Sequence, residues 1–212
     1  MPIEMTPVQK PHPPLWYGVA KPEGAAWPAQ NKVNIVTSVP GRPGTDDHPT
    51  PIARPGPPPA TRPPRYPLIG MSRHIVIAET DAAALAIARR GYQRWHASFM
   101  KLWIKHGAQP LNAVYPDNFD ALQDMGLGVA GAPDTVRAVL SDHVEVSGIN
   151  YLACRFAFGD LSFEESQRSL ELFTRAVMPT LRRARADGQL EDGVSGSFEP
   201  DIPGFRPPGN SA

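Results

Sequence analysis

Apolar and polar residues alternate along this chain in blocks that predict strands and helices in turn. In residues 1–39, the apolar segment 15–17 and the β-branched segment 33–39 predict buried strands. Residues 22–30 lie between them and predict a short helix, because Pro22 suits a first helical turn. The first region is therefore expected to form a strand–helix–strand unit.

The same alternation resumes after residue 67. The apolar run His74–Ala78 predicts a strand, and Asp81 is a favourable N-cap for a long helix that should end at Gly107. The apolar face of this helix repeats every three or four residues and comprises Leu85, Ala88, Tyr92, Trp95, Phe99 and Leu102.

Three further elements are predicted downstream. Residues 117–130 contain a short helical stretch, and Pro133 suits the first turn of a helix that Gly148 ends. Residues 149–158 carry the most strongly apolar strand pattern of the chain.

A last helix is expected after this strand. Ser162 and Glu165 have the spacing of a capping box at its start. Pro179 lies inside the apolar pattern of the helix and should kink or divide it. Residues 187–212 are rich in Gly, Pro, Ser and acidic residues, and we expect this tail to be disordered.

Prolines separate the two patterned regions. Residues 40–67 hold 11 prolines in 28 positions, which excludes a helix and a sheet interior. Pro55–Pro58 follows Arg54 and fits a motif that SH3-type domains bind, although a passive extended linker is favoured. The predicted organisation is a unit at 1–39, a proline-rich linker at 40–67, a second unit at 68–186 and the tail.

Composition excludes several classes of function. The chain has 21 basic and 21 acidic residues, so it lacks the charge expected for binding nucleic acid or an anionic membrane. Six scattered histidines and the single Cys154 argue against a metal site and exclude an internal disulfide. The first ten residues lack the apolar run of a signal peptide, and we expect a cytoplasmic location.

The alternating order predicts an α/β fold whose parallel strands are covered by helices. Four predicted strands form either a small open sheet or half of a barrel. A closed eight-stranded barrel needs about 250 residues, and this chain has 212. The pattern alone leaves both architectures open.

Four segments, in order, carry a resemblance to a known family. The segment from Gly159 to Pro179 resembles the C-terminal signature of bacterial-luciferase-like flavin-dependent monooxygenases. Residues 131–136 resemble the family's Gly-(Ser/Thr)-Pro-Glu-x-Val helix start, except that Ala132 lacks the hydroxyl. Residues 70–81 and 9–18 are similar to the segments around its seventh strand and before its fifth.

The resemblance implies the C-terminal half, strands 5–8, of a (β/α)8 TIM barrel with a proline-rich insertion and a disordered tail. Strands 1–4 are expected before Met1, so the chain would be a truncated form. The family carries a helix between its sixth and seventh strands, where this chain has its proline-rich linker. The resemblance also implies FMN, reduced by a separate reductase, which oxidises a small organic substrate with O2.

The cofactor loop is expected after the first strand. Barrel sites form at the carboxyl ends of the strands, and the family's loop there often holds serines that bind the flavin phosphate. This chain lacks those hydroxyls, and Lys21 could replace them as a point charge. An ordinary strand-to-helix turn remains the alternative. The candidate cofactor-binding residues are Gly18, Val19, Ala20, Lys21 and Gly24.

Four other residues have plainer expected roles, and no catalytic residue is assigned. Arg73 is expected to be solvated, and His74 to precede a strand. Cys154 is expected to be a small buried hydrophobe. Arg155 would face a barrel interior, where it could reach an anionic group, although pairing with a carboxylate is favoured.

Three functions remain in competition. The first is a flavin-dependent monooxygenase acting on a small-molecule substrate. The second is a non-catalytic remnant or an interaction module that displays its proline-rich segment. The third is a half barrel that forms a homodimer or associates with the missing N-terminal half, because uncovered strands and apolar faces favour association.

Overall fold

The computed structural model describes residues 13–19, 22–37, 67–110, 115–147 and 149–181. Nearly all of the predicted proline-rich linker, and the whole predicted tail, lie outside these residues. The helices and strands, in chain order, are β1 (Trp16–Val19), η1 (Pro22–Ala25), α1 (Ala26–Gln30), β2 (Asn34–Thr37), β3 (Ile69–Ile77), α2 (Asp81–Lys105), α3 (Phe119–Asp124), β4 (Gly128–Gly131), α4 (Pro133–Ser147), β5 (Tyr151–Arg155), α5 (Phe163–Leu172) and the π-helical turn η2 (Phe173–Val177).

One parallel sheet contains all five described strands, as the α/β pattern predicts. β3 is its central strand and has three partners. Ile69 pairs with Ile35 of β2, residues 70–74 pair with β5, and His74 pairs with Gly128 of β4. The strands β1, β2, β3 and β5 are therefore neighbours in the order in which they occur in the chain.

The sequence pattern missed one strand and shortened another. β4 was not predicted, because four residues that include two glycines carry no strand pattern. β3 begins at Ile69, five residues before the predicted start at His74, because the polar Ser72 and Arg73 interrupt the apolar run. Arg73 is 3% exposed and His74 is 1% exposed, so the expectations that Arg73 is solvated and that His74 precedes the strand are wrong.

One face of the sheet, the α4 face, is covered by η1, α4, α5 and η2. Ile75, Ile77 and Val129 pack there against Leu140 and Phe173. At the other end of the sheet, Val19 and Ile35 pack against Ala25. The alternation of side chains along each strand places the odd-numbered residues of β1, β2 and β3 on this face.

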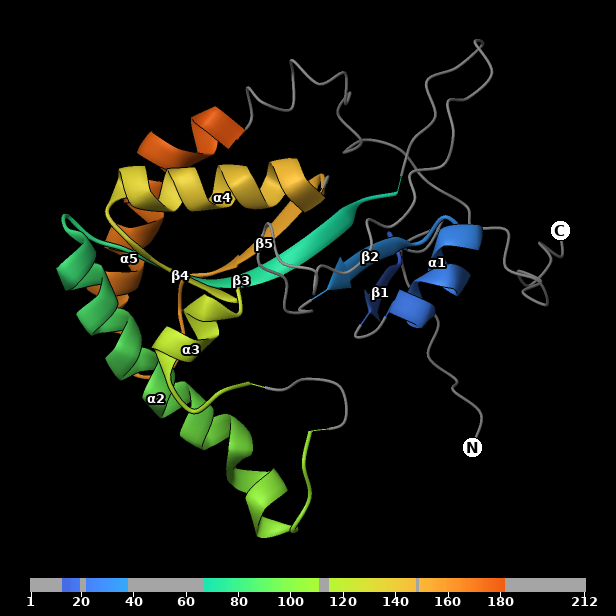
Figure 1. Cartoon of the computed structure of the whole chain (residues 1–212), viewed down its shortest axis with the longest axis horizontal. Coiled ribbons are helices and arrows are strands. Elements are labelled where there is room, and N and C mark those ends of the chain that lie inside the picture. The colour runs from blue at the N-terminus through green and yellow to red at the C-terminus, as the bar shows by residue number, and fades with distance from the viewer. Residues whose placement is uncertain (1–12, 20–21, 38–66, 111–114, 148, 182–212) are drawn as a thin grey trace, which may run out of the picture.

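Among the described residues, helices α2 and α3 cover the opposite face, the α2 face, toward the carboxyl ends of β3 and β4 (Figure 1). Val76 and Ala78 pack there against Ala84, Tyr92 and Phe119 of α2 and α3. The helix that follows β3 thus lies on the opposite face from the helix that follows β1. A simple barrel keeps its helices on one face of the sheet, so the described fold is a mixed α/β fold with a parallel sheet.

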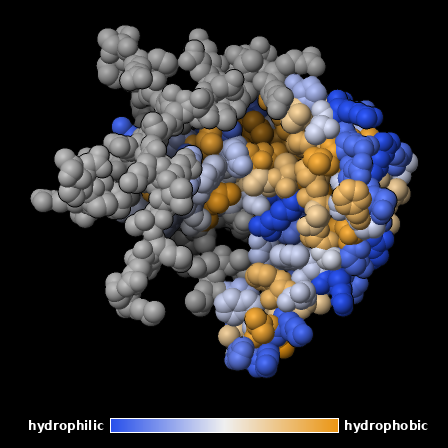
Figure 2. Space-filling view, turned by 180° about the vertical axis from the view of Figure 1, so that it is seen from behind, coloured by the Kyte–Doolittle hydropathy of each residue, from blue (hydrophilic) through white to orange (hydrophobic). Residues whose placement is uncertain are grey.

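Helix α2 extends beyond the core that it covers. Its buried residues end at Tyr92, and its carboxyl end projects from the rest of the molecule with apolar side chains exposed (Figures 1 and 2). Leu102 and Ile104 are 63% and 70% exposed there. The predicted apolar face is therefore buried in its first half and exposed at Leu102. No helix in the described part of the chain is long and apolar enough to cross a membrane.

The start of α2 also differs from the prediction. Thr80, rather than Asp81, is the N-cap, and its hydroxyl accepts a hydrogen bond from the amide of Ala83. The carboxylate of Asp81 instead accepts a 2.7 Å hydrogen bond from the amide of Ala132 at the start of α4. This bond, with a second one from Thr135, lowers the pKa of Asp81. Asp81 therefore ties the starts of α2 and α4 together.

The predictions for the last helix are confirmed. Ser162 and Glu165 form a complete capping box at the start of α5. The helix widens into the π-helical turn η2 just before Pro179, which has no amide hydrogen to bond back to the preceding turn.

Two glycines let the loop after β5 lie directly against α2. Gly159 has a φ of +64°, and a Cβ at this position would overlap the carbonyl oxygen of Gly91. A Cβ at Gly91 would in turn lie 2.7 Å from the side chain of Leu161. Only glycine at position 159 allows this backbone contact, whereas a Cβ at position 91 would displace the end of the Leu161 side chain.

Replacing Gly159 with alanine is expected to lower the free energy of unfolding by at least ~2 kcal/mol, because strain at positive φ adds to a clash with backbone. Gly107 has a φ of +62° with no atom within 4 Å of its Cβ position, so Gly107→Ala is the matched control and should cost about 1 kcal/mol. Urea unfolding of both variants measures the difference. Equal losses in the two variants would show that the contact with Gly91 is not tight.

Candidate functional site on the α2 face

The α2 face carries small and aromatic side chains where the carboxyl ends of β1 and β2 meet the amino ends of β3 and β5. The strand registers place one residue from each strand in a row across the sheet, and they bring together Gly18, Val36, Gly70 and Tyr151. The next row toward the carboxyl end pairs Ser72 with Ala153. Gly18 has no atom within 4 Å of its Cβ position, whereas Gly70 and Ser72 are buried.

Two aromatic rings meet across this face. The rings of Trp16 on β1 and Tyr151 on β5 lie with their centroids 4.8 Å apart, although β2 and β3 separate the two strands. Three strand spacings in a flat sheet amount to ~14 Å. Both side chains therefore lean toward each other over Gly70, where a Cβ would come within 3.0 Å of the Tyr151 ring. A sheet curled toward the α2 face favours this contact.

Further along the same face, His74 is enclosed by aromatic rings. Its imidazole is 1% exposed and makes edge-on contacts with four rings that approach from α2, from the segment before α3 and from the loop after β5. The four rings are those of Tyr92, Trp95, Tyr115 and Phe158. The Tyr92 hydroxyl donates a 2.7 Å hydrogen bond to the carbonyl of Pro116, which fixes this enclosure.

Arg155 is the charged neighbour of His74. The two residues are paired in the register of β3 and β5, and Nη1 of Arg155 lies 3.5 Å from Nε2 of His74. Burial, and then the charge of Arg155, lower the pKa of His74 to about 3. The imidazole is therefore neutral at pH 7, and its Nε2 can accept the hydrogen bond from Arg155.

The expected carboxylate partner of Arg155 is absent from the described part of the chain. The ion pairs there join other arginines to Asp and Glu residues, and the recorded partner of Arg155 is His74. The preference for an Arg155–carboxylate pair is therefore wrong for these residues. In the sequence, the one sign of an unusual role for Arg155 was its position as a lone arginine inside the apolar segment 149–158.

Arg73 lies next to His74 along β3 but on the α4 face. Its Nη1 donates a 2.9 Å hydrogen bond to the carbonyl of Ser72, and its buried Nε has no partner among the described residues. Burial lowers the pKa of Arg73 to about 10. Cys154 points to the same face, and burial raises the pKa of its thiol to about 12. The expectation that Cys154 is a small hydrophobe rather than a nucleophile fits this environment.

The candidate cofactor loop is described only in part. Gly18 is exposed at the carboxyl end of β1, and no atom lies within 4 Å of its Cβ position. Val19 is buried against the α4 face, and Gly24 lies in the turn η1. Ala20 and Lys21 lie outside the described residues. The phosphate-binding role of this loop stays a prediction.

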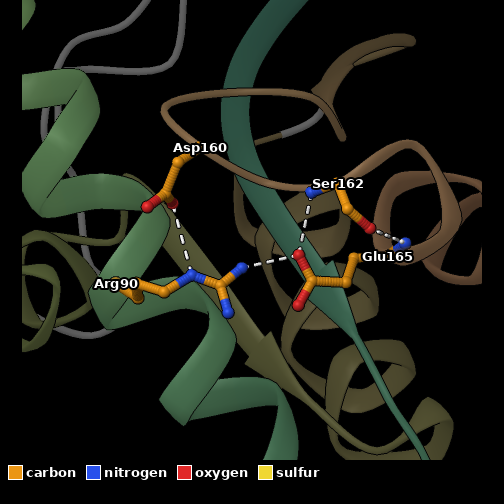
Figure 3. Close-up of polar contacts among 4 residues, drawn as sticks. All are labelled: Arg90, Asp160, Ser162 and Glu165. Carbon is orange, nitrogen blue, oxygen red and sulfur yellow. Dashed lines mark hydrogen bonds and ion pairs between the residues drawn. The ribbon is translucent and has the colours of Figure 1, made fainter.

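The loop after β5 is held to α2 by charged side chains as well as by the glycine contact. Arg90 of α2 donates to Asp160 over 3.3 Å and to Glu165 over 2.6 Å (Figure 3). Glu165 also accepts a hydrogen bond from the amide of Ser162 in the capping box. The network is largely exposed, so its contribution to stability is modest. Its geometry nevertheless fixes the loop that carries Phe158 onto His74.

An open pocket of about 340 Å³ lies where this loop meets α2. Its lining includes the cations of Arg94 and Lys101, together with Trp95 and Gly159. Trp95 also contacts His74, so the pocket adjoins the aromatic enclosure from the solvent side.

No protein-family model matches the chain. A curated relative, the uncharacterized protein y4wF of Sinorhizobium fredii (strain NBRC 101917 / NGR234), is 33% identical over 169 residues. The matched region is 78% of this chain and 48% of that protein. The chain thus spans about half the length of the curated relative that it matches.

Two solved structures are similar to the described fold. The monooxygenase RslO1 from Streptomyces bottropensis is 21% identical with a TM-score of 0.54, over 82% of this chain and 50% of that one. The structure of apo-MsnO8 is 20% identical with a TM-score of 0.50, over 84% of this chain and 55% of that one. The parallel sheet with its helices is therefore similar to the fold of a monooxygenase, again over about half of the compared chain.

The buried neutral His74 predicts a loss of stability in mild acid. The pKa of His74 is lower in the folded than in the unfolded chain, so between pH 6.5 and pH 3 the unfolded chain binds more protons. The free energy of unfolding should therefore fall with decreasing pH by up to ~1.4 kcal/mol per unit from this residue.

Chemical denaturation of the wild type and of His74→Phe at pH 7.0, 6.0 and 5.0 measures this slope. The phenylalanine keeps an aromatic ring in the enclosure and cannot titrate, so the wild type should lose more stability than the variant. Parallel pH profiles for the two proteins would contradict a neutral buried His74.

Proposed function

We propose that this chain belongs to a luciferase-like flavin-dependent monooxygenase that oxidises a small organic substrate with O2 and reduced FMN. The observation that carries the proposal is the order of the parallel strands. β1, β2, β3 and β5 are neighbours in chain order, as consecutive strands of a (β/α)8 barrel are. The sequence resemblance to the family over residues 9–18, 70–81 and 131–179 supports the same reading, as does the similarity in fold to a monooxygenase.

The four strands would be strands 5–8 of the barrel, with the α4 face outside and the α2 face inside. The contact of Trp16 with Tyr151 supports this arrangement, because barrel closure requires the sheet to curl toward its inner face. In this arrangement α2 and α3 lie over the carboxyl ends of the strands, where barrel enzymes bind their substrates. Their position on the α2 face would make them a cover of the site rather than part of the outer ring.

The described residues of the α2 face suit a planar, partly apolar ring system. Gly18 faces open space, and Trp16 and Tyr151 offer aromatic contact on the same face. FMN would supply the reaction with O2, and the protein would bind it, orient it and exclude water. Gly18, Val19, Ala20, Lys21 and Gly24 are proposed to hold its phosphate. Backbone amides and the charge of Lys21 would replace the missing serine hydroxyls.

The rest of the barrel would have to come from another polypeptide segment. The curated relative and RslO1 are about twice as long as the region matched. A complementary N-terminal half, or a second copy of this chain, would cover the exposed edge and the α2 face. The alternative is a non-catalytic module that presents its proline-rich segment 40–67, which stands where the family has a helix.

FMN binding tests the proposal directly. We expect the purified chain to quench FMN fluorescence saturably at one FMN per site, either as a dimer or after co-expression with the N-terminal half of a relative. Gly18→Val places a branched side chain into open space on the α2 face, so it should weaken FMN binding at least ~10-fold without loss of stability.

Ala138→Val, at an exposed position of α4, is the control and should leave FMN binding unchanged. Size-exclusion chromatography with light scattering gives the mass of each flavin-bound species. A monomer that binds no flavin, together with a co-expressed pair that binds none, would contradict the proposal and favour the non-catalytic alternative.

A further inference from the structure

We infer that Arg155, positioned by His74, forms an oxyanion site on the α2 face that binds the carboxylate or phosphate group of a small ligand. The inference deepens the proposed function and rests on it for the kind of ligand, a small organic molecule held above the sheet. It adds a negatively charged group to that ligand. It also assigns the site to two residues outside the candidate cofactor loop.

The first observation that supports an anion site is the position of Arg155 on the sheet. It shares its face with Ser72, Ala153 and His74, because the register of β3 and β5 aligns these positions. Its side chain is partly exposed, whereas His74 beside it is buried. The guanidinium therefore lies where the aromatic enclosure around His74 meets the less buried side chains of Ala153 and Tyr151.

The second observation is that the positive charge of Arg155 is not balanced by a neighbouring carboxylate among the described residues. His74 is neutral, and no carboxylate in the described part of the chain pairs with Arg155. A guanidinium has five N–H donors, and the contact with His74 engages one of its nitrogens. A positive charge with unused donors on a partly buried face is best satisfied by an anion.

The shape of the guanidinium selects the class of anion. Its planar fork presents two parallel N–H groups that match the two oxygens of a carboxylate or phosphate. His74 holds one edge of the group through Nε2, which orients the other edge. His74 is thus a positioning residue, and Arg155 is the group that binds.

NMR of arginine Nε–H groups tests the inference without any flavin. The Arg155 resonance is identified by its disappearance in Arg155→Met, a change that keeps an unbranched apolar stem and removes the guanidinium. Sodium benzoate and inorganic phosphate are the two probes, titrated at constant ionic strength. We expect a saturable shift of the Arg155 resonance with at least one probe, and the stronger response distinguishes a carboxylate from a phosphate ligand.

Substitutions then separate binding from structure, with the affinity of each variant for the probe measured by isothermal titration calorimetry, because Arg155→Met and Arg155→Lys lack the Arg155 resonance. Arg155→Lys keeps the charge but loses the planar fork, and should weaken binding of the active probe at least ~10-fold. His74→Gln keeps an acceptor and should retain binding within ~3-fold, whereas His74→Phe should weaken it ~10-fold. Arg94→Met removes a cation of the neighbouring open pocket and should leave the Arg155 shift unchanged.

Two results would overturn the inference. One is the absence of a saturable shift of the Arg155 resonance with both probes in a folded protein. The other is equal binding in Arg155→Met and the wild type, or loss of binding in Arg94→Met, either of which would place the anion elsewhere. Anion binding without FMN binding would contradict the proposed function and support the Arg155 site. FMN binding without anion binding would support the proposed function and contradict the Arg155 site.

Discussion

Strand β3 pairs with three parallel strands, and this pairing determines which residues face each side of the sheet. Its nine residues bond to β2 at one end, to β4 at the other and to β5 along the middle. A strand in this position is buried on both faces, so its polar residues Ser72, Arg73 and His74 are taken out of water with it. Burying such groups is unfavourable unless they find partners. The hydrogen bonds of Arg73 to the backbone and of His74 to Arg155 follow from that requirement.

The two faces of β3 then acquire different roles. The α4 face is closed by apolar side chains of α4 and η2, and further anchored where the hydroxyl of Ser169 accepts a hydrogen bond from the amide of Ile77. In the described part of the chain, the α2 face is closed at its carboxyl end by the aromatic residues around His74. The contact between Gly91 and Gly159 sets how closely the loop after β5 approaches this enclosure. Apolar packing on the α4 face therefore holds the strands in place, and the same strands present the partly exposed Arg155 on the α2 face.

The sequence predicted the element types well and the surroundings of His74 and Arg155 poorly, for physical reasons. The capping box at Ser162, the turn at Pro179 and the long helix after residue 80 each depend on local chemistry that is visible in a few neighbouring residues. The strand β4 and the first half of β3 depend on partners far away in the chain, and no local pattern marks them. The pair of His74 and Arg155 has the same origin, because 81 positions separate its members and only the strand register joins them.

We propose that the sheet curls toward the α2 face as the strands of a barrel do. The most direct measurement is the nuclear Overhauser effect between the ring protons of Trp16 and Tyr151, on strands that β2 and β3 separate. We expect strong cross-peaks between the two rings, because their centroids lie 4.8 Å apart. Ordered rings on a folded sheet with no cross-peaks between them would mean that the sheet is flat there, and the half barrel would be contradicted.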